Sequence, residues 1–160
     1  IIAPHEMQNL SALKKQTNAL LFSKANSTNI RNSNVLIIDS IGILSNIYSY
    51  GNIAYIGGGF GSGIHNILEA VTFGLPVIFG PNHQKFKETT ELINKKGAIS
   101  ISNYKELTSA IDIFTNFDKT IAINFIQENS GATKKILDSG NEVRRELLSY
   151  MENFDIKFKK

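Results

Sequence analysis

The sequence predicts an α/β fold, in which helices flank a parallel β-sheet. Short apolar runs alternate along the chain with longer segments of helical periodicity, a pattern typical of βαβ units. The runs are continuously apolar, as expected of strands that are buried on both faces. Glycine-rich or polar segments follow several of them, at the sheet edge where such folds bind ligands. The expected arrangement is Rossmann-like.

Composition supports one folded domain spanning residues 1–160. Hydrophobic residues make up 42% of the chain and charged residues 19%, which favours a globular protein over a disordered one. The absence of cysteine excludes disulfides, thiolate metal sites and a cysteine nucleophile. No apolar run approaches the roughly 20 residues of a membrane span, and no signal peptide is visible. Because the chain opens inside an apparent strand, we expect it to be part of a longer protein.

The predicted elements alternate along the chain. The predicted strands are Ile1–Ala3, Val35–Ile38, Ile53–Ile56, Val77–Phe79 and Ala98–Ile101. The predicted helices are Glu6–Lys24, Ser40–Tyr50, His65–Phe73, Lys85–Lys95 and Lys105–Phe114. Residues 26–34 are expected to form a loop. Two or three further helices are expected between residues 118 and 152, with breaks at Ser130–Gly131 and Ser139–Gly140.

A glycine-rich segment after the strand Ile53–Ile56 is the main candidate for a binding site. Five of the seven residues from Gly57 to Gly63 are glycine, so the backbone can approach a ligand closely. The predicted following helix would direct its free N–H groups at this turn, where a phosphate fits. No Lys or Arg lies between Arg31 and Lys85, so an anion here would depend on backbone N–H groups.

The helix predicted after the turn has an apolar and a polar face. Its core positions are expected to be Ile64, Leu68 and Val71, and its polar positions are Ser62, His65, Asn66 and Glu69. Asn66 and Glu69 are i,i+3 neighbours, so both can meet one ligand. The Glu69 carboxylate can accept hydrogen bonds from two adjacent sugar hydroxyls. A phosphate site beside such a carboxylate indicates a nucleotide with its ribose.

The glycine-rich segment and Glu69 also allow other interpretations. A glycine-rich turn can be purely structural, and Glu69 can be a solvated surface residue. An ATP-binding P-loop is excluded because no Gly-Lys-Ser/Thr is present, and the dinucleotide fingerprint G-x-G-x-x-G/A fits no register of residues 57–66. A nucleic-acid surface would need clustered Lys and Arg, which this region lacks. A response-regulator-like site would need an acidic cluster, and Asp39 stands alone.

Several segments together carry the motifs of one enzyme family. The segments are Gly57–Gly58, Gly63–Ala70 and Gly74–Pro81, preceded by Ala3–Glu6 and by Asp39–Leu44 with Tyr48, and followed by Phe86. They resemble the Gly-Gly turn, the Gly-His-Asn-x-x-Glu signature, and the Gly-x-Pro and Gly-Pro motifs of the Kdo transferases, which transfer 3-deoxy-D-manno-octulosonic acid (Kdo) to the lipid A precursor. The chain departs from the family at His5, which directly follows Pro4, and at Ile43 and Ile64.

The resemblance implies a glycosyltransferase of the GT-B type, whose carboxyl-terminal, donor-binding half this chain represents. The implied donor is CMP-Kdo and the implied acceptor is a lipid A precursor. The acceptor site, the general base and the membrane anchor are expected in the missing amino-terminal domain, against which the last helix is expected to pack. No catalytic residue, metal or cofactor is expected in this chain. The full-length protein is expected at the cytoplasmic face of the bacterial inner membrane, with this fragment soluble and inactive alone.

The resemblance also assigns residues to the donor site. Amides near Gly58, Gly63, Ile64 and His65, with the Asn66 side chain, are expected to hold the phosphate, and Glu69 the ribose. Ser40 and Ile41 are expected near the cytosine. His5 is expected to reach the phosphate or the Kdo carboxylate, although a surface-loop histidine is an equal alternative. Two other functions stay open: a GT-B enzyme or epimerase using a UDP-sugar, and a non-catalytic nucleotide-binding domain.

Overall fold

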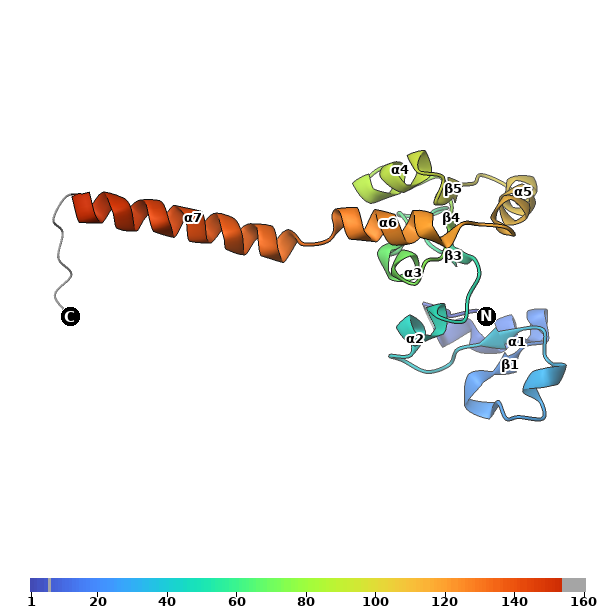
Figure 1. Cartoon of the computed structure of the whole chain (residues 1–160). Helices are drawn as coiled ribbons and strands as arrows, with labels where there is room; N and C mark the ends of the chain where they lie inside the picture. Colours follow the sequence, from blue (N-terminus) through green and yellow to red (C-terminus); the bar gives the residue numbers. More distant parts are fainter. Residues whose placement is uncertain (6, 154–160) are drawn as a thin grey trace.

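The computed structural model describes residues 1–5 and 7–153 and confirms the α/β class. Its strand pairings are parallel, and helices flank them (Figure 1). The strands are β1 (Leu20–Leu21), β2 (Leu36–Ile37), β3 (Ala54–Ile56), β4 (Val77–Phe79) and β5 (Ala98–Ser100). The helices are α1 (Leu10–Thr17), α2 (Leu44–Tyr48), α3 (Leu68–Thr72), α4 (Lys87–Asn94), α5 (Tyr104–Phe114), α6 (Lys119–Asn129) and α7 (Ala132–Asn153), with 3₁₀ turns at Met7–Asn9, Phe22–Lys24 and Ile30–Asn32.

The larger sheet has the strand order β3-β4-β5. Ile56 of β3 pairs with Phe79 of β4, which in turn pairs with Ser100 of β5, so the three strands end at the same edge. The central strand β4 is buried along its whole length. Burial on both faces explains why β4 is continuously apolar, as the sequence predicted.

Helices cover both faces of this sheet. On one face, the core unites residues of β3, β4 and β5 with residues of α3, α4 and α6: Ala54, Ile56, Val77, Phe79, Ala98, Ala70, Val71, Leu92, Ala122 and Phe125. On the other face, Ile78 packs against Ala110 and Phe114 of α5. Alternate residues of β4 and β5 therefore face different cores, as the two-residue period of a strand requires.

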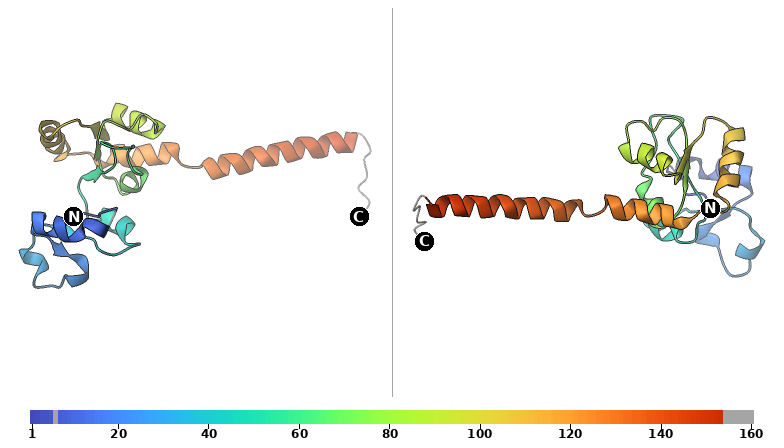
Figure 2. Two further views of the ribbon diagram at one scale, coloured as in Figure 1. Left: turned by 180° about the vertical axis from the view of Figure 1, so that it is seen from behind. Right: turned by 45° about the horizontal axis from the view of Figure 1, so that its top comes forward.

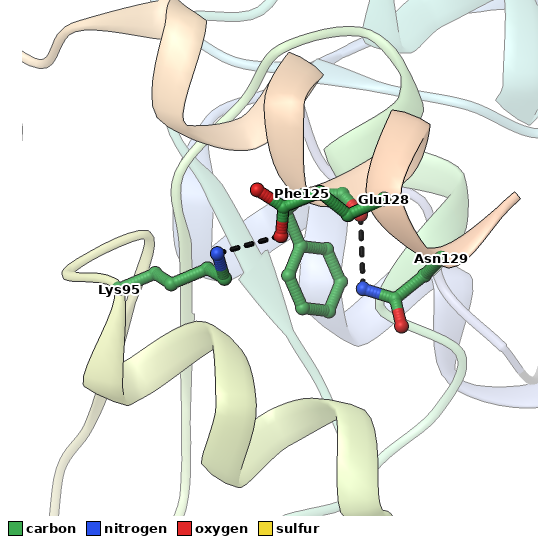
Figure 3. A network of polar contacts seen from close by, with 4 residues as sticks. All are labelled: Lys95, Phe125, Glu128 and Asn129. Atoms are coloured by element: carbon green, nitrogen blue, oxygen red, sulfur yellow. Dashed lines mark hydrogen bonds and ion pairs between the residues drawn. The ribbon is translucent and has the colours of Figure 1, made fainter.

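Helix α6 is fixed to the first face chiefly by an apolar side chain. Phe125 is fully buried beneath the helix (Figure 3). Beside it, Lys95 Nζ pairs with Glu128 at 2.6 Å, and Asn129 Nδ2 donates to the Phe125 carbonyl at 3.0 Å. Both partners of the ion pair are partly exposed, so it adds only about 0–1 kcal/mol, whereas burial of a phenylalanine contributes about 1.5–3 kcal/mol.

The first part of the chain forms a smaller parallel sheet. Strand β1 pairs with β2, and Ile2 pairs with Ile37 on the other side of β2. Ile2 N–H donates to the Leu36 carbonyl and Ile38 N–H to the Ile2 carbonyl, both at 2.8 Å. The predicted strand at residues 1–3 is thereby reduced to one bridging residue.

The predicted helix Glu6–Lys24 was wrong at its carboxyl end, and Glu6 itself lies outside the described residues. Helix α1 stops at Thr17, because Asn18 adopts a left-handed conformation with φ 50°. The chain then extends as β1, whose Leu20 N–H donates to the Val35 carbonyl at 2.9 Å. A pairing with a distant strand therefore overrode a local helical pattern.

Other boundaries also differ from those predicted. Helix α2 occupies only residues 44–48 of the predicted span 40–50. The break at Ser130–Gly131 is confirmed, and Gly131 has a φ of +89°. The break predicted at Ser139–Gly140 was wrong, since α7 runs through both residues. One glycine in a helix interior costs about 1 kcal/mol, which does not end a long helix.

Helix α7 projects away from the rest of the protein in all views (Figures 1 and 2). It carries exposed apolar side chains on one side, namely Ile136, Leu137, Val143, Leu147 and Leu148. Among the described residues, no helix combines the length and apolarity that crossing a membrane requires.

Candidate functional site

The glycine turn, residues 57–63, starts where β3 ends. Gly61 N–H and Gly63 N–H both donate to the Gly58 carbonyl, at 2.9 and 3.3 Å. Gly58 has a φ of +87°, and a Cβ at this position would collide with the Gly63 carbonyl oxygen. The conformation of the turn alone therefore requires glycine at position 58. A role in ligand binding would be a second reason for glycine there.

The loop after β4 packs directly against the turn. Gly59 and Gly80 are buried back to back, and a Cβ on Gly59 would lie 2.6 Å from the Gly80 nitrogen. Asn82 N–H donates to the Gly59 carbonyl at 2.9 Å, and Asn82 Nδ2 donates to the Gly61 carbonyl at 2.8 Å. Sequence reasoning missed Asn82. The available signal was its position just after a neighbouring parallel strand, at the same sheet edge.

Helix α3 begins at Leu68, three residues later than predicted. Residues 63–67 are instead irregular, and Ile64 and Ile67 enter the core. Leu68, predicted to face the core, is 36% exposed because of this shift. Since α3 has only five residues, few aligned peptide dipoles stand behind the turn, and the N–H groups of the turn itself become the main donors.

Two of the four amides expected at a phosphate already have partners. Gly63 N–H donates to Gly58, and His65 N–H donates to the Gly57 carbonyl at 3.0 Å. In the part of the chain that the structure describes, the amides of Gly58 and Ile64 have no protein acceptor. A ligand can therefore accept hydrogen bonds from these two N–H groups without breaking a bond inside the protein.

Asn66 and Glu69 meet, as their spacing predicted. Asn66 Oδ1 accepts the Leu68 N–H at 2.9 Å, and Asn66 Nδ2 donates to Glu69 Oε1 at 3.1 Å. Both side chains are exposed. The asparagine thus caps the first turn of α3 and fixes one carboxylate oxygen of Glu69. Among the described residues, nothing donates to Glu69 Oε2.

The structure brings two distant histidines together beside the turn. The rings of His5 and His65 have centroids 4.7 Å apart and are tilted by 30°. Both side chains are exposed. The pairing of Ile2 with β2 carries His5 to this position. His5 is therefore adjacent to a predicted site residue and does not stand on a remote loop.

Ser40 and Ile41 follow β2, and no hydrogen bond among the described residues joins them to the turn. Ile41 is 94% exposed. Asp39, next to them, accepts hydrogen bonds from Ser23 Oγ at 2.5 Å and Ser23 N–H at 2.9 Å. These two bonds, the hydroxyl bond first, hold the Asp39 pKa below its ordinary value. Asp39 therefore links the loop that follows β2 to Ser23, in the segment that follows β1.

Helix α2 brings a further aromatic residue close to Glu69. Tyr48 is half-buried, and its ring lies 6.3 Å from that of Phe73. Burial, and then the negative charge of Glu69, raise the pKa of the Tyr48 hydroxyl. The phenol is therefore a neutral group beside the carboxylate, a neighbour that sequence reasoning did not assign to the site.

The sheet edge at the turn presents several polar groups to a ligand. It offers backbone N–H groups, two histidines and one carboxylate. Within the described residues, no group of three or more His, Cys, Asp or Glu could hold a metal ion. Such a set of groups can bind an anion and a sugar diol next to one another.

Comparisons with known proteins show sequence similarity to enzymes of one name. The chain is 31% identical over 125 residues to the 3-deoxy-D-manno-octulosonic acid transferase of Aquifex aeolicus, a match that covers 77% of this chain and 35% of the relative. It is 30% identical over 154 residues to the enzyme of that name from Rickettsia prowazekii, covering 92% of this chain and 32% of the relative. The chain thus spans about a third of the length of these relatives. No family model matches it.

A solved structure shares the fold. The C-terminal CMP-Kdo binding domain of WaaA from Acinetobacter baumannii matches 88% of this chain and 70% of its own length, with a TM-score of 0.57 and 20% sequence identity. This likeness confirms the Rossmann-like fold expected from the sequence. With the two sequence matches, it shows that the chain is a relative of the 3-deoxy-D-manno-octulosonic acid transferases and corresponds to about one third of such an enzyme.

Proposed function

We propose that this chain binds the CMP part of CMP-Kdo, as the donor-binding domain of a Kdo transferase. The glycine turn beside the Asn66–Glu69 pair is the observation that carries the proposal. N–H groups at Gly58 and Ile64 would hold the single phosphate, and Glu69 Oε2 would accept hydrogen bonds from the ribose hydroxyls. The relatives named as Kdo transferases, and the neighbour named as a CMP-Kdo binding domain, support this assignment.

In the proposed reaction, the bond between Kdo and the CMP phosphate breaks while a lipid A precursor hydroxyl forms a new bond to Kdo. The hydroxyl proton passes to a general base in the amino-terminal domain. This chain stabilises the negative charge that builds on the departing CMP phosphate, through N–H groups at the turn. His5, whose ring lies 4.7 Å from that of His65, would reach the phosphate or the Kdo carboxylate. Ser40 and Ile41 would lie near the cytosine.

A titration of this chain with CMP and with UMP, followed by amide chemical shifts, tests the proposal. We expect CMP to shift the amides of residues 57–69 and to bind more tightly than UMP. Tighter binding of UMP would favour the alternative, an enzyme that uses a UDP-sugar. The absence of any shift at residues 57–69 would contradict donor binding at this turn.

The projecting helix α7 has a proposed role in the full-length protein. Its exposed apolar side chains, such as Val143 and Leu147, would pack against the amino-terminal domain, which also carries the acceptor site and the membrane anchor at the cytoplasmic face of the inner membrane. Leu147→Glu should then lower the melting temperature of the full-length protein and leave CMP binding by this chain unchanged. An unaltered full-length melting temperature would exclude this packing.

A further inference from the structure

A turn with five glycines in seven residues does not hold one conformation by itself. Glycine has more conformational freedom in the unfolded and partly ordered chain than any other residue. Inside the turn, only the bonds from Gly61 and Gly63 to the Gly58 carbonyl restrain it, and the second is long at 3.3 Å. Its shape must therefore be imposed from outside.

Asn82 supplies that restraint from the neighbouring loop. Its N–H and its Nδ2 bind the carbonyls of Gly59 and Gly61, two residues apart on the turn. Its own carbonyl lies 3.7 Å from the position that a Cβ of Gly63 would take. Asn82 thus bonds to the turn at two positions, Gly59 and Gly61, and its carbonyl faces a third, Gly63.

The position of Asn82 is itself well defined. It follows Gly80, which is buried against Gly59, and Pro81, whose ring fixes the backbone angle φ. Gln84, in the same loop, closes a further bond from Nε2 to the Pro81 carbonyl at 2.8 Å. The loop therefore presents Asn82 to the turn in an ordered conformation.

We infer that Asn82 is a positioning residue of the donor site, which fixes the glycine turn in the shape that receives the phosphate. The inference rests on the proposed function. Asn82 makes no bond to the ligand in this role. It acts through the turn, by holding the segment that contains the amides of Gly58 and Ile64 in one conformation, so that ligand binding does not bear the entropy cost of ordering the turn.

The variant Asn82→Ala tests this inference on the chain itself. It removes the bond to Gly61 and keeps the main-chain bond to Gly59. Loss of one such hydrogen bond should weaken CMP binding roughly two- to tenfold. In the ligand-free chain, ¹⁵N order parameters of residues 57–63 should fall. Asn82→Asp keeps the size of the side chain but removes its donor, and it should weaken CMP binding at least as much.

Asn129→Ala is the matched control, because it also removes a bond from an asparagine Nδ2 to a backbone carbonyl, at 3.0 Å, but in α6, outside both the turn and the loop after β4. It should leave both CMP affinity and the order of residues 57–63 unchanged. The inference is overturned if both Asn82 variants bind CMP like the parent chain, or if Asn129→Ala weakens binding equally. A parent chain that binds no CMP would instead overturn the proposed function, and this inference with it.

Discussion

Replacing Glu69 by alanine probes the ribose side of the proposed site. The change removes the carboxylate whose Oε1 accepts from Asn66 Nδ2 at 3.1 Å and whose Oε2 has no donor among the described residues. If Oε2 binds the ribose, its loss leaves hydroxyls of the bound nucleotide unpaired. The expected cost is about 1–3 kcal/mol, which weakens CMP binding roughly 5- to 150-fold.

The assay is a calorimetric titration of the parent chain and of Glu69→Ala, each with CMP and with 2′,3′-dideoxy-CMP. The second nucleotide lacks the hydroxyls that Glu69 is proposed to bind. The variant should therefore lose affinity for CMP and lose almost none for the dideoxy compound. This cycle separates a contact with the ribose from a general disturbance of the turn.

The protein contains a close internal control at the start of α5. Asn103 Nδ2 donates to Glu106 Oε1 at 2.7 Å, the same i,i+3 arrangement of asparagine and glutamate. Glu106→Ala should lower stability and leave CMP affinity intact. Equal CMP binding by Glu69→Ala and the parent chain would refute the assignment of Glu69, as would an equal loss for both nucleotides.

Three other outcomes follow from the geometry. Gly59→Ala would place a Cβ 2.6 Å from a backbone nitrogen of the adjoining loop, so urea unfolding should show a loss of about 1–3 kcal/mol; an unchanged midpoint would contradict this close contact. Asn66→Ala removes the cap of α3 and the donor to the carboxylate, so it should cost about 1 kcal/mol of stability and also weaken CMP binding; stability lost with full affinity would make the residue structural only. The pKa of Asp39 is lowered chiefly by the Ser23 hydroxyl, so its stabilisation is present above the pKa of the unfolded chain and is lost as the pH falls through the lowered value. Urea titrations at pH 7 and below pH 4 should therefore show that the parent chain exceeds Asp39→Asn in unfolding free energy by less at the lower pH. A difference that does not change with pH would contradict the bond.

The sequence predicted the larger sheet well because its signals are local. Strands β3, β4 and β5 are short apolar runs bounded by glycine, proline or polar residues, and each lies within its predicted span. Strand β1 has no such signal. Its two leucines also fit a helix, and only the pairing with β2, 16 residues away in register, makes them a strand. Pairing over that distance depends on the folded chain, and no local pattern contains it.

The candidate site divides in the same way. The meeting of Asn66 and Glu69 was predictable, because helical spacing alone brings residues three apart together. The contact of His5 with His65 and the bonds of Asn82 to the turn were not predictable, since each joins segments that lie far apart in the sequence. The resemblance to a known family indicated that His5 belongs to the site, but it did not indicate a neighbour for it.

The late start of α3 changes which groups can act on a phosphate. Had the helix begun at His65, its free N–H groups would have faced the turn, with the helix dipole behind them. Instead, the His65 amide is bonded within the turn and Asn66 caps the Leu68 amide. The anion-binding capacity then depends on the conformation of the glycines, and that conformation depends on the loop after β4. The proposed donor site, which looks contiguous in the sequence, would therefore be assembled from separate segments, and substitutions in the loop after β4 should affect it as strongly as those in the glycine motif.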